Sequence, residues 1–204
     1  MSTWWVGGGT VPPTSIGSTA DRATADFEAL IAGVTISMVS LDPQKNFMNN
    51  FAFLDGQNVH LAVKELGWQI DWGKFRIYLK EKYHVQRAYI FLGYVSRNEG
   101  LYNFLRNYGY ILVFKPTITK GSITKGNVDL NIALQVMLDY KAFDQAILIT
   151  NDGDFYCLVD YLKARNKLHS VISPNIHKCA RLLKQSAQEK MQTITFSQKI
   201  LSKK

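Results

Sequence analysis

The stretch AILITNDGDFYCLVDYL, residues 146–162, joins an apolar run to a helical pattern through a turn that contains two aspartates. The run AILI at 146–149 has no polar alternation, which is typical of a strand covered on both faces of a parallel sheet. Four apolar residues then follow at the i, i+3, i+4, i+7 spacing of an amphipathic helix: Phe155, Leu158, Val159 and Leu162. The stretch predicts a buried strand, an acidic turn and a helix that packs on the sheet.

Four further apolar runs repeat this arrangement, separated by segments with helical spacing: FAFL (51–54), YIFL (89–92), YILVF (110–114) and SVIS (170–173). One helical segment has an apolar face that we expect to pack on the sheet: Leu101, Phe104, Leu105 and Tyr108. Alternating strands and helices predict an α/β fold, a Rossmann-like three-layer sandwich with a central, mostly parallel sheet. From His177 onward we expect a further helix that packs through Leu182 and Leu183.

The first 46 residues differ from the rest. WWVGGGTVPPTSIGST (4–19) is rich in Gly, Pro, Ser and Thr and has no sustained period, as in loops or disordered segments. Two interpretations stay open: residues 1–46 form a flexible extension, or they are a spurious leader before a true start at Met38 or Met48. In either case we expect one domain, at residues 47–204.

Charge and composition limit the function classes. Residues 47–204 hold 22 of the 24 basic and 12 of the 16 acidic residues, a net charge of +10 that favours a polyanionic partner. No apolar run approaches the roughly 20 residues that a membrane span requires, so we expect no membrane partner and a cytoplasmic protein. Cys157 and Cys179 suggest no disulfide framework, and we expect both to be reduced and buried.

Four acids fall where the predicted strands end or the following helices begin: Asp55, Asp129, Asp152 and Asp154. The carboxyl ends of parallel strands form the ligand-binding edge of such sheets, so we expect these side chains to meet. Oxygen ligands favour Mg²⁺ or Mn²⁺, and the four histidines lack the spacing of a zinc site. Each acid also has a structural interpretation, as a helix cap or a turn residue.

Three motifs carry a family resemblance: FLDGQN (53–58), KGNVDLNIALQVM (125–137) and ILITNDGDFYCLVDYL (147–162). In this order they resemble the NYN domains, specifically the LabA-like branch of the PIN-like nuclease superfamily, over about residues 50–190. The resemblance implies a PIN-like sandwich and a metal-dependent ribonuclease that hydrolyses single-stranded RNA. It also implies that Mg²⁺ or Mn²⁺ is held by four catalytic acids: Asp55, Asp129, Asp152 and Asp154. Asn151 stands where many relatives have glycine, and we expect this difference to matter little.

Substrate contacts are predicted beside the acids. The resemblance matches Asn58 to a polar partner of Asp55. Arg97 follows the second strand, and Lys120 and Lys125 lie on the Gly/Thr/Ser-rich loop KPTITKGSITKG (115–126), where basic side chains can contact a phosphate backbone. We interpret Tyr94 as a half-buried rim aromatic rather than a base-stacking residue. A homodimer and an antitoxin-like or regulatory protein partner are compatible with the family.

The main alternative is a non-catalytic RNA- or protein-binding regulatory module on the same NYN fold. Other magnesium or nucleotide folds fit less well. A haloacid dehalogenase needs an acid where Gln57 stands, an EF-hand starting at Asp152 needs a glutamate where Lys163 stands, and FLDGQNVH (53–60) lacks a dinucleotide-binding glycine fingerprint.

Overall fold

The structure is a computed structural model that describes residues 48–203 except 116–117, 121–122, 126–127 and 195–197; in 118–120 and 123–125 it describes the backbone alone. The predicted extension at 1–46 lies outside the described residues, so the domain boundary stays a prediction. Among the residues that are described, every helix is too short or too polar to cross a lipid bilayer.

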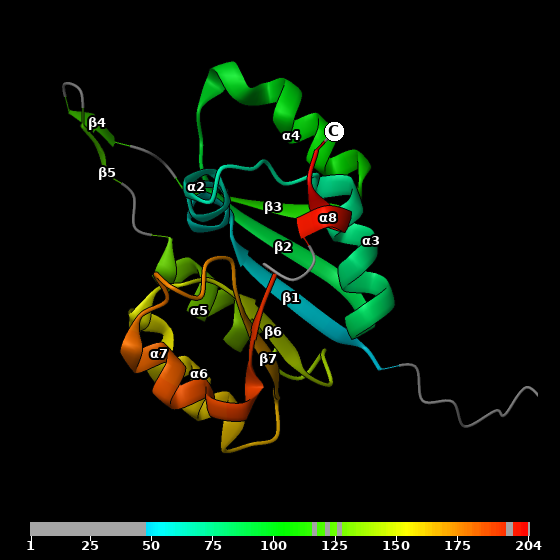
Figure 1. Cartoon of the computed structure of the whole chain (residues 1–204), viewed down its shortest axis with the longest axis vertical. Coiled ribbons are helices and arrows are strands. Elements are labelled where there is room, and N and C mark those ends of the chain that lie inside the picture. The colour runs from blue at the N-terminus through cyan, green and yellow to red at the C-terminus, as the bar shows by residue number, and fades with distance from the viewer. Residues whose placement is uncertain (1–47, 116–117, 121–122, 126–127, 195–197, 204) are drawn as a thin grey trace, which may run out of the picture. The chain divides into compact units, whose positions relative to one another are not determined.

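A six-stranded parallel sheet forms the centre, in the order β3-β2-β1-β6-β7-β8 (Figure 1). Its strands are β1 (Asn50–Asp55), β2 (Val85–Gly93), β3 (Tyr110–Lys115), β6 (Ala146–Ile149), β7 (Leu168–Ser173) and β8 (Met191–Thr193). The five predicted strands are confirmed, and β8 is an additional one that its short, partly polar sequence did not reveal. The chain reverses its direction of progress across the sheet between β1 and β6, which places a topological switch point there.

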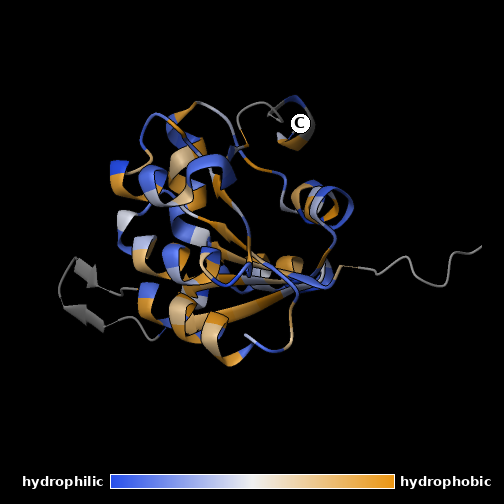
Figure 2. Cartoon of the chain, turned by 90° about the horizontal axis from the view of Figure 1, so that it is seen from below, coloured by the Kyte–Doolittle hydropathy of each residue, from blue (hydrophilic) through white to orange (hydrophobic). Residues whose placement is uncertain are grey.

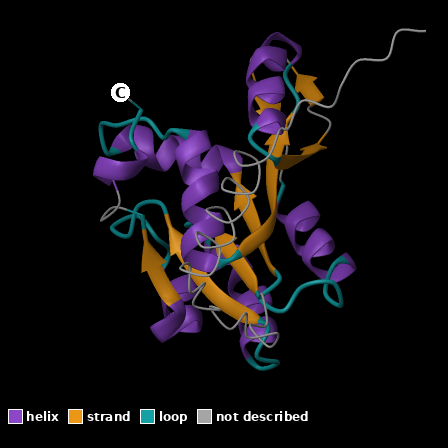
Figure 3. Cartoon of the chain, turned by 90° about the vertical axis from the view of Figure 1, so that its right-hand side faces the viewer, coloured by secondary structure: helices purple, strands orange, loops and turns teal. Residues whose placement is uncertain are grey.

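Helices cover both faces of the sheet (Figures 1 and 3). One face carries α2 (Gly56–Glu65), α3 (Trp72–Tyr83), α4 (Glu99–Asn107) and α8 (Gln198–Leu201). The other carries α5 (Asp129–Leu138), α6 (Tyr156–Lys163) and α7 (Arg181–Ala187). Short 3₁₀ turns are η1 (Ser96–Asn98), η2 (Gly153–Phe155) and η3 (Gln188–Lys190). The predicted three-layer α/β sandwich is therefore confirmed.

Alternate residues of each strand feed two separate cores. In β1, Ala52 and Leu54 join the core under α2, α3 and α4, whereas Phe51 and Phe53 join the core under α5, α6 and α7. Figure 2 shows the hydrophobic residues concentrated on the strands and on the inner sides of the helices. Burying each large apolar side chain contributes about 1.5–3 kcal/mol. These two cores hold β1 rigidly in the middle of the sheet.

Between β3 and α5 the structure departs from the predicted loop. β4 (Ile118–Lys120) and β5 (Ile123–Lys125) pair in antiparallel register as a separate hairpin. Because threonine and isoleucine favour extended backbone, the repeated ITK sequence suits two short strands. Figure 1 shows the hairpin projecting away from the sheet.

Three predictions about packing were wrong in part. In α7, Leu183 is buried but Leu182 is exposed. Cys179 is buried, whereas Cys157 is exposed on α6. In α4, Tyr102 and Leu105 are the buried residues, and the rest of the predicted face is about two-fifths exposed: Leu101 (42%), Phe104 (42%) and Tyr108 (44%).

The orientation of α4 is explained by Tyr102. Its ring lies 4.7 Å, centroid to centroid, from that of Phe114, and its hydroxyl accepts a 2.9 Å hydrogen bond from the Val95 amide. A buried tyrosine that satisfies both its ring and its hydroxyl is a strong anchor. Its anchoring turns Leu101, Phe104 and Tyr108 to the side of the helix rather than onto the sheet.

Candidate metal centre

The edge formed by the carboxyl ends of β1 and β6 brings distant parts of the chain together. The two strands pair in parallel, with Leu54 opposite Ile149. Asp55, which ends β1, therefore lies beside the turn that follows β6. Open α/β sheets bind ligands at this kind of position, where the strand order reverses.

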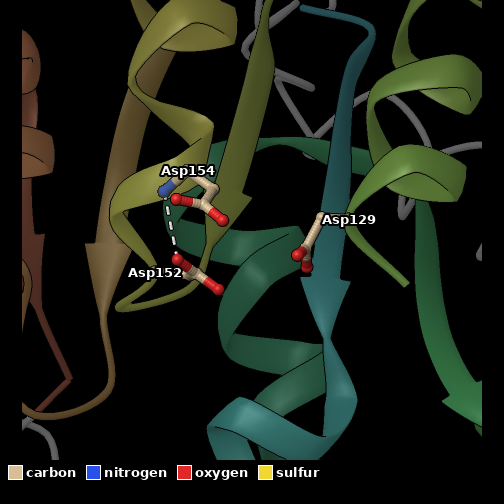
Figure 4. A group of neighbouring side chains, drawn as sticks. All are labelled: Asp129, Asp152 and Asp154. Carbon is tan, nitrogen blue, oxygen red and sulfur yellow. Dashed lines mark hydrogen bonds between the residues drawn. The ribbon is translucent and has the colours of Figure 1, made fainter. Parts of the chain in front are cut away.

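Three carboxylates form a compact group at this edge (Figure 4). Asp129 begins α5, while Asp152 and Asp154 belong to the turn after β6. One carboxylate oxygen from each lies within 4.8 Å of the other two. Asp129 and Asp152 are half-buried and Asp154 is exposed. The predicted meeting of these three acids is confirmed.

The acidic turn is fixed by its own backbone. Oδ1 of Asp152 accepts a 3.0 Å hydrogen bond from the Asp154 amide, drawn in Figure 4, and the Asp152 amide donates to Oγ1 of Thr150 at 3.1 Å. A Cβ atom on Gly153 would lie only 2.9 Å from Cβ of Ala180, so the turn can approach the start of α7 because this residue is glycine. The glycine between the two aspartates is thus required by close packing.

Asp55, the fourth predicted ligand, is not a member of this group. It is 6% exposed and caps α2, with Oδ1 accepting a 3.0 Å hydrogen bond from the Asn58 amide. Burial raises the pKa of Asp55 to about 6, the hydrogen bond from the Asn58 amide opposes this rise, and the charges of Asp129 and Asp152 add to it. The negative charge of the group therefore contributes to the raised pKa of Asp55, although Asp55 is not one of its three members.

Two asparagines join the strand ends, and only one of them was singled out from the sequence. Oδ1 of Asn58 accepts a 3.0 Å hydrogen bond from the Asn151 amide, which ties α2 to the turn after β6. The buried Asn151 side chain accepts a 2.5 Å hydrogen bond from the Ser173 hydroxyl, and the backbone carbonyl of Asn151 accepts one from the Ala180 amide at 3.0 Å. Asn151 was expected to matter little, yet it links the turn to β7 and α7. The sequence signal that could have indicated this linking role is the position of Asn151, a polar residue between the end of β6 and Asp152.

The group suits a hard divalent cation. Its ligand atoms are all oxygens, and Mg²⁺, Mn²⁺ and Ca²⁺ prefer such ligands. Oxygens on opposite sides of one such ion are about 4–5 Å apart, which is comparable to the 4.8 Å spread of the three carboxylates. Without a cation, carboxylates this close repel one another.

The structure describes the three predicted basic substrate-binding residues to different degrees. Arg97 is exposed in η1, immediately beyond the end of β2. Lys120 and Lys125 lie in β4 and β5, and their side chains lie outside the described residues. Tyr94 is a rim aromatic whose ring contacts Tyr102 and Phe114 and whose hydroxyl donates to Glu99, but it is exposed (41%) and not half-buried as predicted.

Fold and site together define the class of protein: a doubly wound α/β domain with a carboxylate group at its topological switch point. The NYN domain family model matches residues 51–194, about 70% of the chain. The chain belongs to the NYN domain family, part of the PIN-like nuclease superfamily. The family predicted from three motifs is therefore confirmed.

One solved structure agrees with this fold. A Vibrio parahaemolyticus protein of unknown function superposes with a TM-score of 0.66 at 22% identity, over 78% of this chain and 99% of its own. The T5 D15 protein, crystallised with metal ions, gives a TM-score of 0.40 at 14% identity, over 61% of this chain and 54% of its own. Only the first likeness supports the fold. A search of curated proteins found no match.

Proposed function

We propose that this NYN domain is a metal-dependent ribonuclease that hydrolyses phosphodiester bonds of single-stranded RNA. The observation that carries the proposal is the approach of three carboxylate oxygens to within 4.8 Å at the switch point of an NYN fold. The three carboxylates come from α5 and from the turn after β6, and their negative charges repel one another at this separation. A cation bound between them would offset this repulsion.

Asp129, Asp152 and Asp154 would hold Mg²⁺ or Mn²⁺. When bound, such an ion polarises the scissile phosphate and acidifies the attacking water. Asp55 would place a fourth negative charge behind the three ligands. Its pKa of about 6 means that it gives up its proton near neutral pH, and a neighbouring cation would lower that pKa.

Hydrogen bonds hold the ligands in place before any substrate arrives. Asn58 and Asn151 fix the turn relative to α2, and the Asp154 amide orients the Asp152 carboxylate. Preorganised ligands of this kind lose little entropy on binding. As the sequence predicts, Arg97, Lys120 and Lys125 would contact phosphates of the RNA. Asn58 would be a fourth substrate contact, beside Asp55.

The test compares cleavage of labelled single-stranded RNA by the full chain in Mg²⁺, Mn²⁺ and EDTA. Asp129→Asn and Asp152→Asn should abolish cleavage in either metal. The matched control is Asp160→Asn, an exposed aspartate of α6 outside the group, which should cleave normally. An Asp129→Asn protein that cuts at the wild-type rate with Mn²⁺ would refute the assignment. Binding of RNA without cleavage in any metal would instead support a regulatory binding module.

The finer predictions from the sequence accompany this proposal. They are membership of the LabA-like branch, a cytoplasmic location, and a homodimer or an antitoxin-like or regulatory protein partner.

A further inference from the structure

A groove lies between α2, α3 and α4, on the face of the sheet opposite α5, α6 and α7. It consists of two adjoining cavities, of about 550 and 400 Å³, which share His60, Trp72 and Leu101. Cavities of about 300–1,000 Å³ are typical of ligand sites. We call this feature the α4 groove and define it by His60, Trp72, Leu101, Phe104, Tyr108 and Lys203.

Exposed aromatic rings form its outer part. Phe104 and Tyr108 stand one helical turn apart on α4, with ring centroids 4.7 Å from each other. Opposite them, Trp72 is held by Tyr110, whose ring meets it edge-on and whose hydroxyl donates to the Trp72 carbonyl at 2.9 Å. The anchoring of Tyr102 leaves the apolar face of α4 uncovered, so the rings are available to a flat, apolar ligand.

The inner part of the groove reaches the acidic edge. Gly56 and Gln57, which directly follow Asp55, line the smaller cavity together with Gly93 at the end of β2. A Cβ atom on Gly56 would lie 2.6 Å from the Leu92 side chain, so glycine is what lets α2 approach β2 here. The groove therefore begins one residue beyond Asp55.

A lysine, a histidine and an aspartate line the groove, and an arginine adjoins it. Lys203 and His60 line it with exposed side chains, and Arg97 adjoins Asn98 at its inner part. The C-terminal segment that carries Lys203 is held by hydrogen bonds from the Asp71 amide to the Leu201 carbonyl and from the Lys203 amide to the Gln69 carbonyl. The single acid among the lining residues, Asp71, caps α3 and pairs with Lys74.

We infer that the α4 groove binds the bases of a single-stranded RNA whose backbone passes the acidic edge, with Phe104, Tyr108 and Trp72 stacking on bases. Exposed aromatic rings with cations nearby can hold single strands without regard to sequence, because every base presents a flat face. This inference rests on the proposed function for the identity of the ligand. A protein segment would also fill an apolar groove, but it has no need of the adjoining cations or of the continuity with the acids.

The experiment measures RNA binding by fluorescence anisotropy with the full chain in EDTA, so that no cleavage occurs. The probes are a short labelled single-stranded RNA and a strand of equal length with abasic sites in place of the bases. Phe104→Ala and Tyr108→Ala should each weaken binding of the intact RNA about 5- to 150-fold. Neither should weaken binding of the abasic strand further, because that strand has no bases to stack.

Two further variants separate stacking from folding. Phe104→Leu keeps an apolar side chain of similar bulk, removes the ring, and should lose RNA affinity while retaining the thermal midpoint of the wild type. Ile77→Ala removes an exposed apolar side chain of α3 outside the groove and should bind RNA normally.

Unchanged RNA affinity in Phe104→Ala, Phe104→Leu and Tyr108→Ala would overturn the inference. A change in sedimentation behaviour with unchanged RNA affinity would also overturn it and assign the groove to a protein partner. The outcome is separable from that of the nuclease proposal. RNA binding that depends on the groove, without cleavage, would contradict the nuclease proposal alone. Cleavage with unaltered RNA affinity in the groove variants would contradict the groove inference alone.

Discussion

Helices α4 and α6 carry the same pattern of apolar residues and use it in opposite ways. In α6 and the turn before it, Phe155, Val159 and Leu162 are buried against the sheet and α7. In α4, the corresponding face is mostly exposed and Leu105 alone of its four residues is buried. The difference teaches that spacing predicts a helix with an apolar face but does not predict what covers that face. The helix whose face is covered begins at the acidic turn, and the other lines the α4 groove.

The largest expected effect is on the cleavage rate, where a substitution in the turn before α6 should act differently from one on the exposed face of α4. Asp154→Asn removes a ligand from the carboxylate group and should lower the cleavage rate at saturating RNA by more than the roughly 10–100-fold typical of residues outside the ligand set. Phe104→Ala should raise KM and leave kcat nearly unchanged, because it removes binding alone. Steady-state kinetics in Mn²⁺ measures both. Equal effects of the two variants on kcat would contradict this division.

Stability provides a matched comparison of the same substitution on the two helices. Leu162→Ala in α6 deletes a fully buried side chain and should lower the free energy of unfolding by about 2–5 kcal/mol. Leu101→Ala in α4 deletes a side chain that already faces the groove and should lower it by less than about 1 kcal/mol. Urea denaturation measures both values. Similar losses would show that the face of α4 is covered in solution.

The pH dependence of the metal-free protein tests Asp55, the buried acid that ends β1 and caps α2. The folded-state pKa of Asp55 is raised from 3.8 to about 6, so the native state binds the proton more tightly than the unfolded state does. Its contribution therefore favours folding below about pH 4 and is lost as the pH rises through 6, by up to about 3 kcal/mol.

The check is urea denaturation in EDTA between pH 4 and 8. Asp55→Asn keeps a good helix cap and should be more stable than the wild type above pH 6 without metal. An equal pH dependence in the two proteins would contradict the assignment.

The last prediction concerns Asn151, which links the turn after β6 to β7 and α7. Asn151→Ala leaves the buried Ser173 hydroxyl without its acceptor and should cost about 1–3 kcal/mol of unfolding free energy. Ser173→Ala in the same background should cost little more, because the shared hydrogen bond is already lost. Strictly additive losses in the double variant would show that the two side chains act independently.

The strand runs were sufficient to predict the sheet because they are unbroken and apolar. Like the other four runs, AILI at 146–149 has the unbroken apolar pattern that is typical of a strand covered on both faces. β8 escaped prediction because Met191, Gln192 and Thr193 are only half-buried at the sheet edge, where polar residues are tolerated. The orientation of α4 escaped because Tyr102, outside the apolar spacing, makes the decisive contacts.

The acidic group was predictable because parallel strands place their carboxyl ends at one edge. What spacing could not reveal was the depth of each acid. Asp55 and Asp152 both follow a strand, yet Asp55 is nearly enclosed and Asp152 is not. Asp55 is the last residue of β1 in the middle of the sheet, whereas Asp152 belongs to the turn after β6, and the spacing of the acids does not show this difference.

The strand order also sets when each part of the molecule is made. The groove is built almost entirely by residues 56–108, whereas Asp152 and Asp154 arrive roughly 100 residues after Asp55. At a synthesis rate of about 5–20 residues per second, the interval is about 5–20 s. During that time a nascent chain can present its aromatic face but has no complete set of acids. The chain order therefore supplies the aromatic side chains of the α4 groove before it supplies all three carboxylates of the acidic group.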